Sequence, residues 1–122
     1  MEIVIEAGNL KVEAELFDTA TARAIYSELP LEVTALTWGD EIYFEIPVSE
    51  KLDETAREVV QVGDLGYWPT GNALCIFFGP TPISGPGEIR PASAVNIVGR
   101  VRGEAERFKE VPAGSIIKVD PA

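Results

Sequence analysis

The sequence contains no histidine and a single cysteine, Cys75. The absence of histidine excludes Ser-His-Asp and Cys-His catalysis. One cysteine cannot form an internal disulfide, and with no histidine beside it the usual zinc sites are excluded as well. Cys75 lies in an apolar run with no basic residue close in sequence, so we expect a buried, unreactive thiol.

Long apolar runs and phosphate-binding motifs are also missing. No run approaches the roughly 18 residues needed to span a bilayer. The opening residues MEIVIEAGNL have no basic segment ahead of an apolar one, so we expect no secretory signal, a cytoplasmic location and no membrane partner. Neither GxxxxGK[ST] nor GxGxxG occurs. We therefore predict no cofactor and assign no catalytic residue.

Positive charge is scarce. The chain has 20 acidic and 10 basic residues, and its first 60 residues carry 14 acids and 4 bases. Such an acidic surface repels phosphate backbones, so we expect no nucleic-acid partner. The acidic half is either a face for a basic partner or a solvated surface. Asp40, Glu41 and Glu45 could bind a hard cation, but we interpret them as separate surface acids and predict no metal.

Apolar alternation is the main structural signal, and it predicts short strands. Gly8-Asn9 separates the first two strands and predicts a tight hairpin. In the run from Glu41 to Ile46, alternation places Glu41 and Glu45 on the outward face. The run Leu74–Phe78 is apolar on both faces, which is typical of a strand covered on both sides. The predicted strands are Glu2–Glu6, Lys11–Leu16, Leu31–Thr37, Glu41–Ile46, Leu65–Trp68, Leu74–Phe78, Ala94–Arg102 and Ser115–Val119.

Helical spacing is clear at one place. Ala22, Ile25, Tyr26 and Leu29 recur on one face after a capping Asp18 or Thr19, and Pro30 ends a helix of about ten residues. Residues 104–109 predict a helical turn anchored by two apolar side chains. Residues 49–60 predict a loop with a short strand at its end. Residues 79–93 predict a long loop stiffened by four prolines.

About eight evenly spaced short strands with Gly and Pro turns favour a closed barrel or a sandwich. The length of 122 residues suits one domain, residues 1–122, with one core. Closure would leave no exposed sheet edge, which suits a monomer or a small homo-oligomer. The sequence therefore predicts a mostly β, single-domain fold with one main helix.

Four strings carry a resemblance to a known family: Thr37–Phe44, Gly63–Pro69, Gly71–Pro82 and Pro91–Gly99. They resemble the small prokaryotic cyclophilin-like proteins of unknown function, and with their flanking elements the resemblance covers nearly the whole chain. It implies a closed antiparallel barrel of about eight strands. The prolyl isomerases of this fold use an arginine with a phenylalanine, a glutamine and a histidine. This chain has no histidine and no copy of that strand motif, so efficient isomerase activity is not expected.

The proline-rich loop at residues 79–93 is the segment that we associate with function. We hypothesise a concave site for a small molecule or peptide in a non-catalytic binding module. The loop could instead be a rigid cover over an open barrel end. The same groove could serve an enzyme, either a weak isomerase or another activity, and the acidic half could make an interaction domain. The candidate site residues are Trp38, Tyr67, Trp68, Asn72, Thr81, Ser84, Arg90, Ser93 and Asn96.

Overall fold

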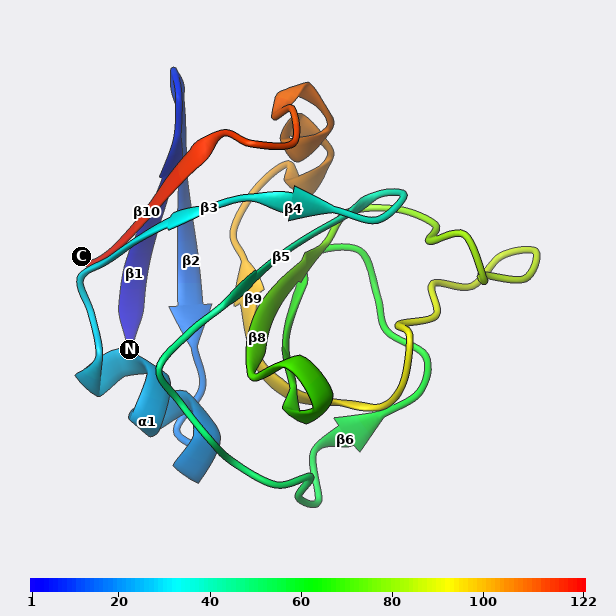
Figure 1. Ribbon diagram of the computed structural model, residues 1–122, viewed down its shortest axis with the longest axis horizontal. Coiled ribbons are helices and arrows are strands. Elements are labelled where there is room, and N and C mark those ends of the chain that lie inside the picture. The colour runs from blue at the N-terminus through cyan, green and yellow to red at the C-terminus, as the bar shows by residue number, and fades with distance from the viewer.

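Ten strands form one antiparallel sheet in the computed structural model, which describes residues 1–122 (Figure 1). Two of the strands have only two residues each, so the eight longer ones match the number predicted from alternation. The elements in chain order are β1 (Glu2–Ala7), β2 (Leu10–Leu16), α1 (Ala20–Ser27), β3 (Leu31–Thr34), β4 (Leu36–Thr37), β5 (Glu41–Glu45), β6 (Ala56–Arg57), β7 (Asp64–Trp68), the 3-10 helix η1 (Pro69–Gly71), β8 (Ala73–Phe77), β9 (Val95–Val101), the 3-10 helix η2 (Ala105–Glu110) and β10 (Ile116–Pro121).

The sheet closes on itself through one extended segment. Its strand order is β3-β10-β1-β2-β9-β7-β8-β5-β4, and β6 pairs with β9 beside this path. The two end strands, β3 and β4, follow each other in the chain with only Ala35 between them. Residues 31–37, predicted as a single strand, therefore pair first with β10 and then with β5. The result is the predicted closed antiparallel barrel.

The barrel interior holds a core cluster of 26 buried residues. The predicted Gly8-Asn9 hairpin joins β1 to β2, with Gly8 at a φ of 60°. Helix α1 begins after Thr19, whose Oγ1 accepts a hydrogen bond from the Ala22 N–H at 3.2 Å, and has eight residues. It covers one end of the barrel, and η2 lies at the other end (Figure 1). As predicted for the helical turn, Phe108 of η2 is buried.

Strand β8 is buried on both of its faces, as its apolar sequence predicts. Leu74 and Ile76 belong to the barrel core, whereas Cys75 and Phe77 belong to a separate, smaller cluster. That outer cluster also contains Ile89, which lies in the 79–93 loop. The loop therefore covers an outer face of the sheet and not an open barrel end. No helix or strand interrupts residues 79–93, so the predicted long loop is confirmed.

Residues 49–60 follow the prediction of a loop with a short strand near its end. Strand β6 lies in this stretch and pairs with β9, placing Ala56 opposite Asn96. Val60 then forms a single antiparallel bridge with Ile89 of the 79–93 loop. These pairings hold the second layer against the barrel. None of the helices is long and apolar enough to cross a membrane.

The fully buried side chain of Asn96 joins β9 to two distant segments. Its Oδ1 accepts from the Asp53 N–H at 2.9 Å, and its Nδ2 donates to the Lys51 carbonyl oxygen at 2.8 Å and to Thr21 Oγ1 at 3.2 Å. Every hydrogen-bonding group of the amide is therefore used within the fold. The side chain fixes the path of residues 51–53 beside the helix and β9.

We expect Asn96→Ala to lower the free energy of unfolding by about 2–4 kcal/mol, because it leaves a backbone donor and acceptor without their partners. Denaturant unfolding monitored by circular dichroism measures the change. The matched control is Asn9→Ala in the exposed hairpin turn, with an expected effect within about 0.5 kcal/mol. A loss below about 1 kcal/mol for Asn96→Ala would show that the network contributes little.

Candidate functional site

A pocket of about 290 Å³ opens on the outer face of the barrel. It lies where β5, β8 and the end of β7 meet the last residues of the 79–93 loop, which we name the covering loop. Six of the eight lining residues are hydrophobic, so the walls suit an apolar ligand surface. The lining residues are Trp38, Glu41, Tyr43, Trp68, Cys75, Pro91, Ala92 and Val95.

Strand register brings the lining residues together from distant parts of the sequence. Glu41 and Tyr43 alternate along β5 and so share one face of the sheet. Tyr43 lies directly opposite Cys75 of β8. Trp68, the last residue of β7, lies opposite Ala73 of β8. Ala73 and Cys75 are two positions apart and so share one face of β8. One outward face of three neighbouring strands therefore supplies most of the pocket.

The indole ring of Trp68 is held from two sides. A Cβ added to Gly71 would lie 2.7 Å from Cζ3 of the ring, so only glycine lets the ring lie this close to the η1 backbone. On the other side, Trp68 Nε1 donates a hydrogen bond to Ser93 Oγ at 2.6 Å. This bond joins the end of β7 to the end of the covering loop. The orientation of the ring is therefore set before any ligand arrives.

Glu41 is the one carboxyl group in the pocket wall, and its residue is only 6% exposed. Burial strips water from the carboxylate and raises the pKa of Glu41 to about 7, while a hydrogen bond with the Cys75 thiol lowers it in part. No lysine or arginine lines the pocket to offset the charge. A carboxyl group with this pKa can either hold or release a proton near neutral pH.

The prediction that Glu41 is a surface acid is wrong. Alternation correctly places Glu41 on the outward face of β5 with Tyr43. That face is not solvent-exposed, however, because the loop and the outer cluster cover it. Glu45, four residues along the same strand, is exposed as predicted. The two acids therefore differ in what covers them and not in the direction in which they point.

Cys75 is 2% exposed, which confirms the predicted burial of the thiol. Burial raises the pKa of Cys75 well above its usual value, and the charge of Glu41 and the hydrogen bond between the two groups raise it further. The thiolate is the reactive form of cysteine, so a raised pKa leaves the thiol weakly nucleophilic. Across the chain, no group of three or more acidic, Cys or His side chains is placed to hold a metal ion.

Three of the candidate residues named from the sequence lie at this pocket. Trp38 and Trp68 line it, and Ser93 holds the Trp68 ring. Trp38 lies in the turn before β5, where its backbone N–H donates to the Glu41 carbonyl oxygen at 3.0 Å. That turn continues into a contact with the covering loop, because the Asp40 N–H donates to the Pro80 carbonyl oxygen at 2.9 Å.

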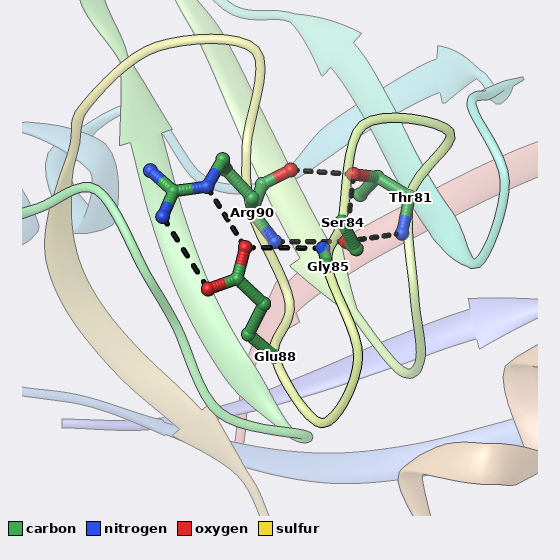
Figure 2. Close-up of polar contacts among 5 residues, drawn as sticks. All are labelled: Thr81, Ser84, Gly85, Glu88 and Arg90. Carbon is green, nitrogen blue, oxygen red and sulfur yellow. Dashed lines mark hydrogen bonds and ion pairs between the residues drawn. The ribbon is translucent and has the colours of Figure 1, made fainter.

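Three further candidates, Thr81, Ser84 and Arg90, bond to one another within the loop (Figure 2). Ser84 Oγ accepts from the backbone N–H groups of Thr81 and Arg90, at 2.9 and 3.0 Å. The Glu88 carboxylate accepts from Arg90 Nε at 2.9 Å and from the Gly85 N–H at 3.1 Å. The hydrogen bonds from Arg90 and Gly85 hold the pKa of Glu88 below its usual value. These groups brace the loop and do not line the pocket.

The remaining candidates, Tyr67, Asn72 and Asn96, lie away from the pocket. The Tyr67 ring is in the barrel core, and its hydroxyl donates to the Val48 carbonyl oxygen at 2.6 Å and lies 3.1 Å from Asn72 Oδ1. Adjacent strand residues point in opposite directions, so Tyr67 faces inward where Trp68 faces outward. Asn96 is committed to the network between β9 and residues 51–53.

Sequence reasoning did not select Glu41, Tyr43, Cys75 or the loop residues Pro91 and Ala92. A usable signal existed in β8, because a strand that is apolar on both faces implies a covering layer on its outer side. Glu41 and Tyr43 belong to the neighbouring strand and share that side. The sequence does not show which segment supplies the cover.

A larger hollow of about 610 Å³ lies between the β1–β2 hairpin and η2. Arg107 and Glu110 line it, and both are exposed. It contains no buried polar side chain that a ligand could satisfy. We therefore take the smaller pocket around Glu41 as the candidate site.

The family model described as Cyclophilin-like matches residues 1–120, and the chain belongs to this family. The hypothetical protein AF2241 from Archaeoglobus fulgidus, solved in solution, is 43% identical, with a TM-score of 0.84 over 100% of this chain and 95% of that one. McbB, solved in complex with tryptophan, is 18% identical, with a TM-score of 0.69 over 98% of this chain and 44% of that one, and shares the fold. No curated protein matches the chain.

The burial of Glu41 makes stability depend on pH. In the unfolded chain this carboxyl ionises near 4.5, whereas in the fold it keeps its proton up to about 7. Between these values the folded state binds the extra proton, so stability falls as pH rises through the window. At about pH 8 the cost is fully present, on the order of 3 kcal/mol at 1.36 kcal/mol per pKa unit.

We expect Glu41→Gln to remove this pH-dependent loss, so that the variant is more stable than the wild type at about pH 8 but not at about pH 4. Denaturant unfolding at a series of pH values measures the difference. Glu45→Gln makes the same change on the exposed part of β5 and should follow the wild type. Parallel pH profiles for Glu41→Gln and the wild type would contradict the raised pKa.

Proposed function

We propose that this protein is a binding module for a small molecule whose apolar body enters the Glu41 pocket. The observation that carries the proposal is a buried carboxyl group in an otherwise apolar, aromatic wall. Sites of this kind are typical of ligand recognition, where apolar walls supply affinity and one polar group sets orientation.

The size of the pocket favours a small ligand. A volume of about 290 Å³ lies just below the roughly 300–1,000 Å³ found for ligand sites. This space suits a single ring with a short substituent, or one side chain of a peptide. Trp38, Tyr43 and Trp68 offer aromatic surfaces to such a ring, and aromatic pairs contribute about 0.5–1.5 kcal/mol beyond area burial.

The covering loop supports the proposal because it is internally braced. Hydrogen bonds within the loop join Thr81, Ser84, Glu88 and Arg90 to other loop residues (Figure 2). Its four prolines also reduce the number of conformations that the loop can adopt in the unfolded chain. A wall that is already ordered costs less entropy on binding than one that must fold around the ligand. The loop therefore acts as a rigid wall that holds Pro91 and Ala92 at the pocket.

A second candidate function is an enzyme that uses Glu41 as a general acid or base. The observation that favours it is the pKa of Glu41, about 7, which suits proton transfer near neutral pH. Arg90 and Glu88 do not join in, because they bond to each other in the loop. Glu41 would act on its own, and we rank this candidate second for that reason.

The binding proposal can be tested by filling the pocket. Ala92 is exposed at the pocket wall, so Ala92→Phe should block entry without disturbing the core. Benzyl alcohol serves as a probe, with an expected Kd on the order of 1 mM for a ligand of this size. Both tryptophans line the pocket, so intrinsic fluorescence and amide chemical shifts report binding directly.

We expect saturable binding to the wild type and at least a tenfold loss of affinity in Ala92→Phe. The control Ala113→Phe places the same ring on an exposed turn far along the chain and should bind as the wild type does. Equal binding by Ala92→Phe and Ala113→Phe, or shifts confined to the hollow beside Arg107, would place the site elsewhere.

The enzyme candidate makes a different prediction. A catalytic carboxylate in the pocket would accelerate exchange of the methyl hydrogens of acetophenone in D2O, and mass spectrometry follows this exchange. For a binding module we expect the wild type and Glu41→Gln to match buffer alone. Exchange above the buffer rate that is lost in Glu41→Gln would favour the enzyme.

A further inference from the structure

The ionisable groups that face Glu41 are few, and none is basic. Tyr43 comes from the same strand and Cys75 from β8, and neither side chain carries a basic group. Trp68, Val95, Pro91 and Ala92 supply no titratable group. An ionised Glu41 therefore has no counter-charge within the pocket.

Several basic side chains outside the pocket are engaged with acidic groups. Arg90 bonds to Glu88 in the loop, Arg100 pairs with Asp64 at 2.9 Å, and Lys109 lies 3.9 Å from Asp40. None of these three cations lines the pocket. A counter-ion for Glu41 has to come from outside the protein.

The rest of the wall suits a cation. Three aromatic side chains, Trp38, Tyr43 and Trp68, line the same pocket as the carboxyl group. The face of an aromatic ring attracts a cation within about 6 Å, most strongly for tryptophan, and the attraction grows when water is excluded. An ammonium group also supplies the N–H donors that the Glu41 oxygens lack.

We propose that the pocket selects an organic ammonium ion, a small primary or secondary amine on an apolar body, held by the Glu41 carboxylate and by the faces of Trp38, Tyr43 and Trp68. This inference rests on the proposed binding function and names its ligand class. A neutral ligand would fill the same volume but leave Glu41 without a partner. An anionic ligand would meet the carboxylate directly.

The binding equilibrium is linked to a proton. The free pocket holds a proton on Glu41 over part of the range up to about pH 7, and an ammonium ligand displaces it. Affinity for an amine should therefore rise as pH increases from about 5 to about 8. A simple alkylamine stays protonated at both values, so the change reports on Glu41.

Three probes of matched size and different charge test the proposal: benzylamine, benzyl alcohol and benzoate. Titrations at about pH 8 follow amide chemical shifts and tryptophan fluorescence. We expect benzylamine to bind at least tenfold more tightly than benzyl alcohol, and benzoate to bind most weakly. In Glu41→Gln, benzylamine should lose about tenfold more affinity than benzyl alcohol does, and circular dichroism checks that the variant is folded.

Non-specific attraction to the acidic surface is separated by two controls. Glu45→Gln removes a neighbouring exposed carboxylate and should keep the preference for benzylamine. Raised salt should weaken surface attraction far more than binding at a buried carboxylate. A preference that disappears in Glu45→Gln or in raised salt would overturn the proposal.

The outcomes also distinguish this inference from the function on which it rests. If benzyl alcohol or benzoate binds the wild type as tightly as benzylamine does, the ammonium proposal is wrong and the binding module stands. If no probe shifts the pocket residues of the wild type and Ala92→Phe changes nothing, the proposed function itself fails.

Discussion

Strand β8 has to bury both of its faces, and the rest of the molecule is arranged around that requirement. Leu74 and Ile76 complete the barrel core, so the inner face is satisfied by closure of the sheet. Cys75 and Phe77 point to the other side, where a barrel alone would leave them in water. Burying such side chains stabilises a protein by roughly 1.5–3 kcal/mol each, which favours a second layer. The chain supplies it with Val60, which follows β6, and with Ile89 of the 79–93 loop.

The second layer creates the pocket and also covers Glu41. An apolar residue at this position would pack in the covered face without the cost of an ionised carboxyl, which we place on the order of 3 kcal/mol above neutral pH. Glu41 is therefore a local conflict between sequence and environment. Such conflicts are expected at functional sites, because elsewhere each local choice agrees with the fold. This conflict, more than the pocket's shape, distinguishes Glu41 from the other acidic residues.

Much of the fold could be predicted from the sequence because it depends on local periodicity. Alternation placed the strands, and the double apolar face of Leu74–Phe78 predicted a layer on each side.

The site could be predicted only in part. Trp68 and Tyr67 are adjacent and both aromatic, and only the register of β7 decides that one faces the pocket and the other the core. The burial of Glu41 could not be predicted from the sequence, because alternation gives the direction of a side chain but not which segment covers it. That cover comes from residues about 50 positions away.

Stability and ligand choice are coupled through the same carboxyl group. An empty pocket above neutral pH contains an ionised Glu41 with no counter-charge, which destabilises the fold. A ligand that brings a positive charge relieves this cost and binds only the folded state, so the relief adds to its affinity. A neutral ligand of equal shape receives only the packing contribution and leaves the carboxylate unpaired. The preference for a cationic over a neutral ligand therefore arises mainly from the free-energy cost of burying an ionised Glu41 without a counter-charge. The strength of the contact between the ligand and the carboxylate contributes less.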